Sequence, residues 1–215
     1  MKLYDYYRSS AAFRVRIALN IKGLMPVREF ISLIDLEQRS KDYLLLNPQG
    51  LVPTLVDDDG TVVTQSMAII EYLDETRPDR PRLIPDTVKD RAWVRALSEI
   101  IACDIHPLNN LRVLRHIGKE FDVDNDTRND IWYKHWIAEG MKSLESTLNS
   151  SSLTGEFCFG DNLTMADCCL VPQVYNAKRF SCDLTSYKTV MRINDVCMNL
   201  SYFEQALPEN QPDAS

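Results

Sequence analysis

Long hydrophobic runs are missing from this sequence, because no stretch approaches the roughly 18 apolar residues that a membrane-spanning helix requires. Glycine is scarce as well, with 7 residues in 215, about half of the ~7% found on average. No long run of valine, isoleucine and threonine follows residue 65. The first seven residues carry charge among their aromatics and lack a small-residue cleavage site, so we expect no signal peptide. These absences favour a mostly helical protein without a membrane segment.

Positive charge is in the minority. The chain carries 24 Lys and Arg against 31 Asp and Glu, which gives a net charge of −7 and a pI near 5.0. No stretch forms a polybasic patch, and a nucleic-acid partner requires a basic face. We therefore expect no nucleic-acid partner. An acidic small molecule would have to be bound by a few arginines brought together locally.

Metal-ligand patterns are also missing. The sequence has three histidines, and its cysteines show no Cys-x-x-Cys spacing. The acidic run Asp57-Asp58-Asp59-Gly60 lacks the alternating ligands and closing glutamate of a calcium loop, and it predicts a hairpin turn. We expect no metal site. The six cysteines are expected to be reduced, mostly buried thiols of a cytoplasmic protein; they are Cys103, Cys158, Cys168, Cys169, Cys182 and Cys197.

Strand and helix patterns alternate in the first third of the chain. Phe13, Ile17 and Ile21 recur at helical spacing, and Gly23 ends that helix. Ser66 is placed to cap the helix that follows it. The expected elements are strands over 2–7, 27–31, 51–56 and 61–64, and helices over 11–22, 36–46 and from residue 67 onward.

A proline-rich segment divides the chain. Residues 76–85 contain three prolines, which is typical of a linker. We therefore predict a domain over residues 1–79, a linker over 80–86 and an all-helical domain over 87–215. The second domain is expected to hold helices over 87–117 with a kink at Pro107, over 127–148 and over 187–200, a capping box from Thr164 to Asp167, and a mobile tail from Pro208.

The stretch from Arg8 to Ile17 is the strongest candidate for chemistry. An aromatic strand pattern, a polar turn and an amphipathic helix follow one another there. Such a junction offers the hydroxyls of Ser9 and Ser10 together with backbone N–H groups at the positive end of a helix dipole. That environment favours an anion, and a thiolate is one anion it could hold.

Four passages carry a family resemblance. They are Ser9-Ser10-x-x-Phe13-Arg14-Val15-Arg16-Ile17-Ala18-Leu19, Asn47-Pro48-x-x-Leu51-Val52-Pro53-Thr54-Leu55, Gln65-Ser66-x-Ala68-Ile69-Ile70-Glu71-Tyr72-Leu73 and Leu163-Thr164-Met165-Ala166-Asp167. With them the chain resembles the zeta class of the glutathione transferases over nearly its whole length. The resemblance implies an α/β plus all-α fold, in which a thioredoxin-like glutathione-binding domain precedes an all-helical domain.

The resemblance also implies an activity and its residues. Zeta enzymes include a glutathione-dependent cis–trans isomerase that converts maleylacetoacetate to fumarylacetoacetate in tyrosine and phenylalanine breakdown. Glutathione would be the cofactor, a keto-dicarboxylate the substrate and a homodimer the assembly. Ser9, Ser10 and Arg8 would be catalytic. The residues implied to bind the cofactor are Ser9, Ser10, Ala11, Val52 (through a cis bond to Pro53), Gln65, Ser66, His106 and Asn110, and those implied to bind the substrate are Arg8, Arg112 and Arg179.

One position departs from the class, and several functions stay open. Zeta enzymes commonly have Ser-Ser-Cys where this chain has Ser9-Ser10-Ala11, so no protein thiol is available there. Maleylpyruvate isomerase of gentisate breakdown uses the same chemistry on a shorter substrate. The sequence is also compatible with a general glutathione transferase and with a non-catalytic glutathione-fold binding module.

Overall fold

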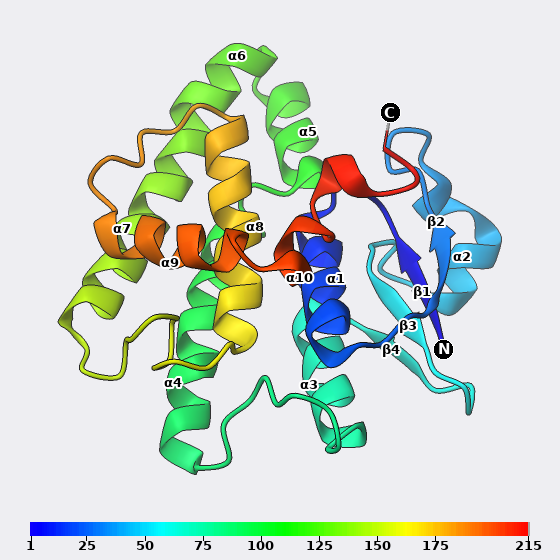
Figure 1. Cartoon of the computed structure of the whole chain (residues 1–215). Coiled ribbons are helices and arrows are strands. Elements are labelled where there is room, and N and C mark those ends of the chain that lie inside the picture. Colours follow the sequence, from blue (N-terminus) through cyan, green and yellow to red (C-terminus); the bar gives the residue numbers. More distant parts are fainter. Residues whose placement is uncertain (215) are drawn as a thin grey trace. The chain divides into compact units, whose positions relative to one another are not determined.

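The structure, a computed structural model, describes residues 1–214 and groups them into two compact units (Figure 1). Unit 1 contains residues 1–84 and the C-terminal segment from Met198, and unit 2 contains residues 85–197. The sequence predicted 1–79, a linker over 80–86 and 87–215. The difference lies mainly in the C-terminal segment, which returns to unit 1 because its backbone accepts hydrogen bonds from that unit, including one from Arg16 to Ala206.

Unit 1 has the predicted alternation of strands and helices. Its sheet has the order β2-β1-β3-β4, with β1 and β2 parallel and the other neighbours antiparallel. A parallel pair needs a crossover, and α1 supplies it. The elements are β1 (Lys2–Asp5), α1 (Ser10–Lys22), β2 (Val27–Phe30), a 3-10 turn (Glu37–Arg39), α2 (Lys41–Leu46), β3 (Thr54–Val56), β4 (Val62–Thr64), α3 (Ser66–Thr76), α10 (Ser201–Glu204) and a second 3-10 turn (Pro208–Asn210).

Helix α1 is buried around almost its whole circumference. Phe13 and Ile17 are at most 1% exposed and pack in the core with Leu3 of β1 and Leu55 of β3. The helix ends at Gly23, whose φ of 63° lies in the left-handed region that glycine adopts without steric cost. Burial on nearly all sides fixes α1 within unit 1, where it packs against α3 and α10.

The hairpin turn after β3 is anchored by one carboxylate. Asp57 accepts hydrogen bonds from Arg77 at 2.6 Å and from the Tyr72 hydroxyl at 2.6 Å, both on or next to α3. The Arg77 guanidinium is the largest reason why the pKa of Asp57 lies far below its usual range. The acidic run is therefore a structural turn that ties the hairpin to α3, as its spacing predicted.

The regular elements of unit 2 within the residues described are all helices, but these helices are more interrupted than expected. The predicted helix over 87–117 ends early, passes through π-helical turns and restarts after Pro107, which has no N–H to continue the helix. The predicted helix over 127–148 has a π-helical stretch near its start. The elements are α4 (Val88–Glu99), η2 (Ile100–Ile105), α5 (Leu111–Glu120), α6 (Asn125–Arg128), η3 (Asn129–Tyr133), α7 (Lys134–Ser150), α8 (Met165–Arg179) and α9 (Lys188–Met198).

The predicted capping box is present at the start of α8. The Asp167 carboxylate is fully buried and accepts from the Thr164 N–H at 2.8 Å and from the Cys158 N–H at 2.9 Å. Helix α8 thus begins at a fixed point in the core of unit 2. Helix α9 is tied in from its N-terminus, where Glu145 of α7 accepts the N–H groups of Thr189 and Val190, both at 2.9 Å.

The C-terminal tail was expected to be mobile, but within residues 208–214 it makes specific contacts. Gln211 is 7% exposed, and its amide donates to the carbonyls of Gln205 and Leu207. Asp213 accepts the N–H of Tyr7 at 2.9 Å. The polar composition suggested a free end, whereas these contacts hold the tail on unit 1; Ser215 lies outside the described residues.

Candidate glutathione site

The candidate site of unit 1 begins at the turn between β1 and α1. Ser9 is the N-cap of α1, and its hydroxyl oxygen accepts the N–H of Ala12 at 3.2 Å. A hydroxyl has one proton to donate and two lone pairs, so capping leaves the proton of Ser9 available to a ligand. The first turn of α1 contains no acidic residue. The helix N-terminus therefore keeps its partial positive charge for a bound anion.

The residues after Ser9 complete this anion-binding end. Ser10 is the first residue of α1 and is 9% exposed, and the half-buried Ala11 follows it. The N–H of Ala11 has no hydrogen-bond partner within residues 1–214. Because Ala11 has no thiol, the turn can stabilise an anionic sulfur but cannot supply one. The sequence predicted this division of roles, and the geometry is compatible with it.

A second helix N-terminus lies at α3. Gln65 is its N-cap in place of the predicted Ser66, and no side chain caps the helix. The N–H groups of Ser66 and Ala68 have no hydrogen-bond partner within the described chain. Gln65 has a φ of 72°, a strained conformation that costs about 1–3 kcal/mol in a residue with a side chain and often marks functional sites. An uncapped helix end without acidic residues suits a carboxylate.

Arg14 joins the two helix ends. It is 2% exposed on α1, and its Nη1 atom donates to the Ser66 hydroxyl at 3.3 Å. A buried guanidinium between two anion-binding helix ends adds to their positive potential. Sequence reasoning placed Arg14 in a motif but gave it no role. The signal for it was a cation within the apolar helical pattern of Phe13 and Ile17.

The loop before β3 presents unpaired backbone at Val52, the residue for which the resemblance implied a cis bond to Pro53. The Val52–Pro53 bond is cis, and neither the N–H nor the carbonyl of Val52 has a partner within residues 1–214. Two side chains that sequence reasoning missed hold this loop. The Tyr43 hydroxyl donates to the Leu51 carbonyl at 2.6 Å, and Asn47 Nδ2 donates to the same carbonyl at 2.8 Å. The free backbone of Val52 could pair with an extended peptide.

Gln49 brings this loop to α3. Its side-chain oxygen accepts from Gln65 Nε2 at 2.6 Å, so Gln65 of the helix and the loop before Val52 are directly joined. Both glutamines belong to unit 1, and Gln65 is partly exposed to solvent. Unit 1 therefore joins Gln65, at the start of α3, to the loop that also carries Val52.

Arg8 precedes Ser9 on the same turn. It is exposed, and its guanidinium carbon lies 5.0 Å from the centroid of the Tyr7 ring. Stacking on the ring restrains the side chain while leaving its N–H groups available in the plane. Arg8 is thus held beside the Ser9 hydroxyl as a cation that can bind a carboxylate.

The remaining predicted residues belong to unit 2. His106 and Asn110 lie in the turn between η2 and α5, where Asn110 caps α5 through the N–H of Arg112 at 3.1 Å. Arg112 is exposed, as is Arg179 at the end of α8, whose guanidinium carbon lies 5.2 Å from the Phe180 ring centroid. The capping bond of Asn110 shows a structural use for that side chain.

Tyr133 links the two parts of unit 2 that carry these residues. Its carbonyl accepts from Asn109 Nδ2 at 3.1 Å, and its ring stacks on Phe180 at a centroid distance of 3.8 Å. Burial raises the pKa of the Tyr133 phenol well above its usual value. The turn before α5 and the end of α8 are therefore held together, with a phenol that stays neutral between them.

Three of the six cysteines are unsuited to nucleophilic chemistry. Cys158, Cys168 and Cys197 are buried, and burial raises the pKa of each thiol, so they are poor nucleophiles. No group of histidine, cysteine or carboxylate side chains within residues 1–214 is arranged to hold a metal ion. Among the helices described, none combines the length and apolarity that crossing a bilayer demands.

Comparison with known proteins identifies the family of the chain. Residues 8–76 match the family of glutathione S-transferase N-terminal domains. A probable maleylacetoacetate isomerase of Vibrio cholerae is 48% identical over 99% of this chain and 97% of its own. A holo structure of a bacterial maleylpyruvate isomerase, a zeta-class glutathione transferase, is 42% identical with a TM-score of 0.95 over 100% of both chains.

A further solved structure carries ligands. The maleylacetoacetate isomerase of Methylobacterium extorquens AM1, with bound malonate and glutathione, is 38% identical with a TM-score of 0.94 over 100% of both chains. Similarity of this extent over whole chains, together with the match of the N-terminal family, leaves one assignment. This chain belongs to the zeta class of the glutathione transferases.

Proposed function

We propose that this chain is a glutathione-dependent maleylacetoacetate isomerase, which acts on a small keto-dicarboxylate in aromatic amino-acid breakdown. The observation that carries the proposal is the Ser9 hydroxyl at the N-terminus of α1, whose first turn contains no acidic residue. The same unit also presents the unpaired backbone of Val52. These are the groups that a γ-glutamyl tripeptide with an ionised thiol requires. The relatives named above, with the activities in their names, support the same conclusion.

The residues present fit glutathione. The uncapped N-terminus of α3, with Gln65 and Ser66, would receive a carboxylate of the cofactor. The Val52 backbone would pair with the peptide backbone of the cofactor in the manner of an added strand. We also propose Ala11, His106 and Asn110 as cofactor contacts. Bound glutathione supplies a thiolate that adds reversibly to the substrate double bond, so that rotation about the resulting single bond becomes possible.

The chain's own groups set the protonation state and the orientation. A free thiol has a pKa near 8.5, so only a few per cent is thiolate at pH 7. The Ser9 hydroxyl would donate a hydrogen bond to the sulfur, and Ser10 with the N–H of Ala11 would add positive potential; both would lower that pKa. Arg8, Arg112 and Arg179 bind the carboxylates of the substrate and stabilise the negative charge that develops on its oxygen.

Maleylpyruvate isomerase is the second candidate, because a zeta-class structure of that name matches the whole chain with a TM-score of 0.95. We expect kcat/KM with glutathione to be higher for maleylacetoacetate than for maleylpyruvate. Steady-state assays of both substrates, in the same buffer and at saturating glutathione, measure the difference. A preference for maleylpyruvate would replace the first function by the second. Activity on neither substrate, with strong conjugation of apolar aryl halides, would favour a general transferase.

The assembly and compartment are part of the same proposal. We propose a cytoplasmic homodimer, because symmetric dimers are the rule in this class. Sedimentation equilibrium at micromolar concentration tests the dimer, and a mass equal to that of one 24.7 kDa chain would reject it.

A further inference from the structure

The peptide groups of Tyr6 and Tyr7, just before the catalytic turn, are held from two sides. Arg16 of α1 is 2% exposed, and its Nη2 atom donates to the Tyr7 carbonyl at 2.9 Å. Its Nη1 atom donates to the Tyr6 carbonyl at 3.4 Å and to Asp5 at 3.0 Å. The guanidinium therefore fixes the carbonyl side of both residues.

The other side is held by the C-terminal segment. Asp213 Oδ2 accepts the N–H of Tyr7 at 2.9 Å, although 206 positions separate the two residues in the chain. The second oxygen, Oδ1, is buried without a hydrogen-bond partner within the described residues. Asp213 as a whole is half-buried, and leaving this one shielded oxygen without a partner costs some stability. The charge of Asp213 also lies close enough to the Arg16 guanidinium for the two to interact electrostatically.

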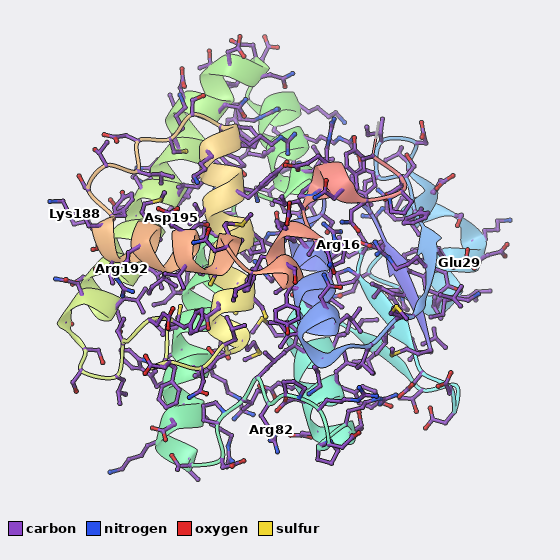
Figure 2. All side chains as sticks on the ribbon, in the orientation of Figure 1. Arg16, Glu29, Arg82, Lys188, Arg192 and Asp195 are labelled. Carbon is purple, nitrogen blue, oxygen red and sulfur yellow. The ribbon has the colours of Figure 1, made fainter. Side chains whose placement is uncertain are left out.

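The same segment also supports Arg16. The carbonyl of Ala206 accepts from Arg16 Nε at 3.0 Å, and Gln211 Oε1 accepts from Arg28 at 3.2 Å. Arg28 pairs in turn with Asp5, which Arg16 also contacts. Figure 2 labels Arg16 where α1 meets the C-terminal segment. The tail and the guanidinium are thus parts of one connected network around the end of β1.

This network directly contacts Ser9, the residue proposed to donate a hydrogen bond to the glutathione sulfur. The Tyr6 carbonyl that accepts from Arg16 also accepts the N–H of Ser9 at 2.9 Å. One residue, Arg8, separates the clamped Tyr7 peptide from Ser9. Any shift of that peptide therefore moves both the Ser9 hydroxyl and the Arg8 guanidinium.

We propose that Asp213 is a positioning residue for catalysis: by holding the Tyr7 N–H from the C-terminal segment, it aims the Ser9 hydroxyl at the sulfur of bound glutathione. The role rests on the proposed function, because it requires a thiolate at Ser9. Loss of the clamp lets the turn move, and a displacement of about 1 Å from a productive geometry can cost up to 10²-fold in rate.

The test compares Asp213→Ala with Asp213→Asn, because asparagine keeps a side-chain oxygen that can accept the Tyr7 N–H. The main readout is the pKa of the bound thiol, measured from the ultraviolet absorbance of the thiolate as pH rises. We expect Asp213→Ala to raise that pKa by about half a unit or more and to lower kcat about tenfold. Asp213→Asn should stay within about twofold of the wild type, since the hydrogen bond is restored.

A matched control separates positioning from stability. Glu145 also accepts backbone N–H groups from a distant segment, but it lies in unit 2 and contacts Thr189 and Val190. Glu145→Ala should lower Tm and leave the thiol pKa unchanged. An unchanged thiol pKa in folded Asp213→Ala protein would overturn the proposal, even if Tm falls. Wild-type protein that forms no glutathione thiolate at neutral pH would contradict the proposed function itself, and the positioning role with it.

Discussion

Replacing Ser9 by alanine should lower kcat for the isomerisation by roughly 10²-fold or more, the loss typical of removing one preorganised donor to a developing anion. The Ser9 hydroxyl caps α1 with a lone pair, which leaves its O–H free to donate a hydrogen bond to a bound thiolate. The substitution removes that hydrogen bond. Without that donor the thiol pKa returns toward its free value, and the thiolate fraction at pH 7 falls. The bound thiol should titrate at higher pH, and raising the pH should recover part of the rate.

The same substitution removes a helix cap, which costs about 1 kcal/mol of stability on its own. Thr87→Ala is the matched control, because Thr87 caps α4 through the Asp90 N–H at the same 3.2 Å distance. That variant should lose stability without losing rate. Ser10→Ala tests the neighbouring hydroxyl and should have the smaller effect. An isomerase rate within a few-fold of the wild type in Ser9→Ala would show that another group ionises the thiol.

Much of unit 1 could be predicted because its signals are local. The spacing of Phe13 and Ile17 indicated the helix after the turn, and Asp57 to Gly60 indicated the hairpin. The cis bond at Val52 was expected from resemblance and is present. The capping box at Thr164 was likewise local and is confirmed. The helix, the hairpin and the capping box depend on a few neighbouring residues, so the sequence specifies them directly, whereas the cis bond was implied only by the resemblance.

The elements that could not be predicted depend on distant partners. A tail rich in proline and charge is typical of a mobile end, and nothing near Asp213 in the sequence indicates that Tyr7 is its partner. The buried cations Arg14 and Arg16 would be expected on a solvent-exposed helix face, since charge is rarely buried without a partner. Their partners, Ser66 and Asp5, lie on other elements. The helix interruption near Pro107 began earlier than proline alone predicts, in π-helical turns from Ile100.

A third buried cation on α1 gives the largest expected effect on stability. Lys22 and Asp74 have fully buried side chains and pair at 3.0 Å. The same Asp74 oxygen accepts the Leu83 N–H at 2.7 Å, and the other oxygen accepts from Arg82, labelled in Figure 2, at 2.9 Å. Asp74 therefore joins the end of α1, helix α3 and the segment that leaves unit 1. Its removal would strand the Lys22 ammonium with the Pro81 carbonyl as its other acceptor.

We expect Asp74→Ala to lower the free energy of unfolding by about 3–5 kcal/mol, because breaking a buried pair leaves an uncompensated charge. That is a large share of the roughly 5–15 kcal/mol that holds a folded protein together. Asp79→Ala is the control, since its pair with Arg80 is exposed and such pairs contribute about 1 kcal/mol or less. Adding Lys22→Met to Asp74→Ala should restore part of the loss by removing the stranded charge. Urea unfolding measures all three variants, and a loss below about 1 kcal/mol for Asp74→Ala would mean that water or a rearranged side chain replaces the carboxylate.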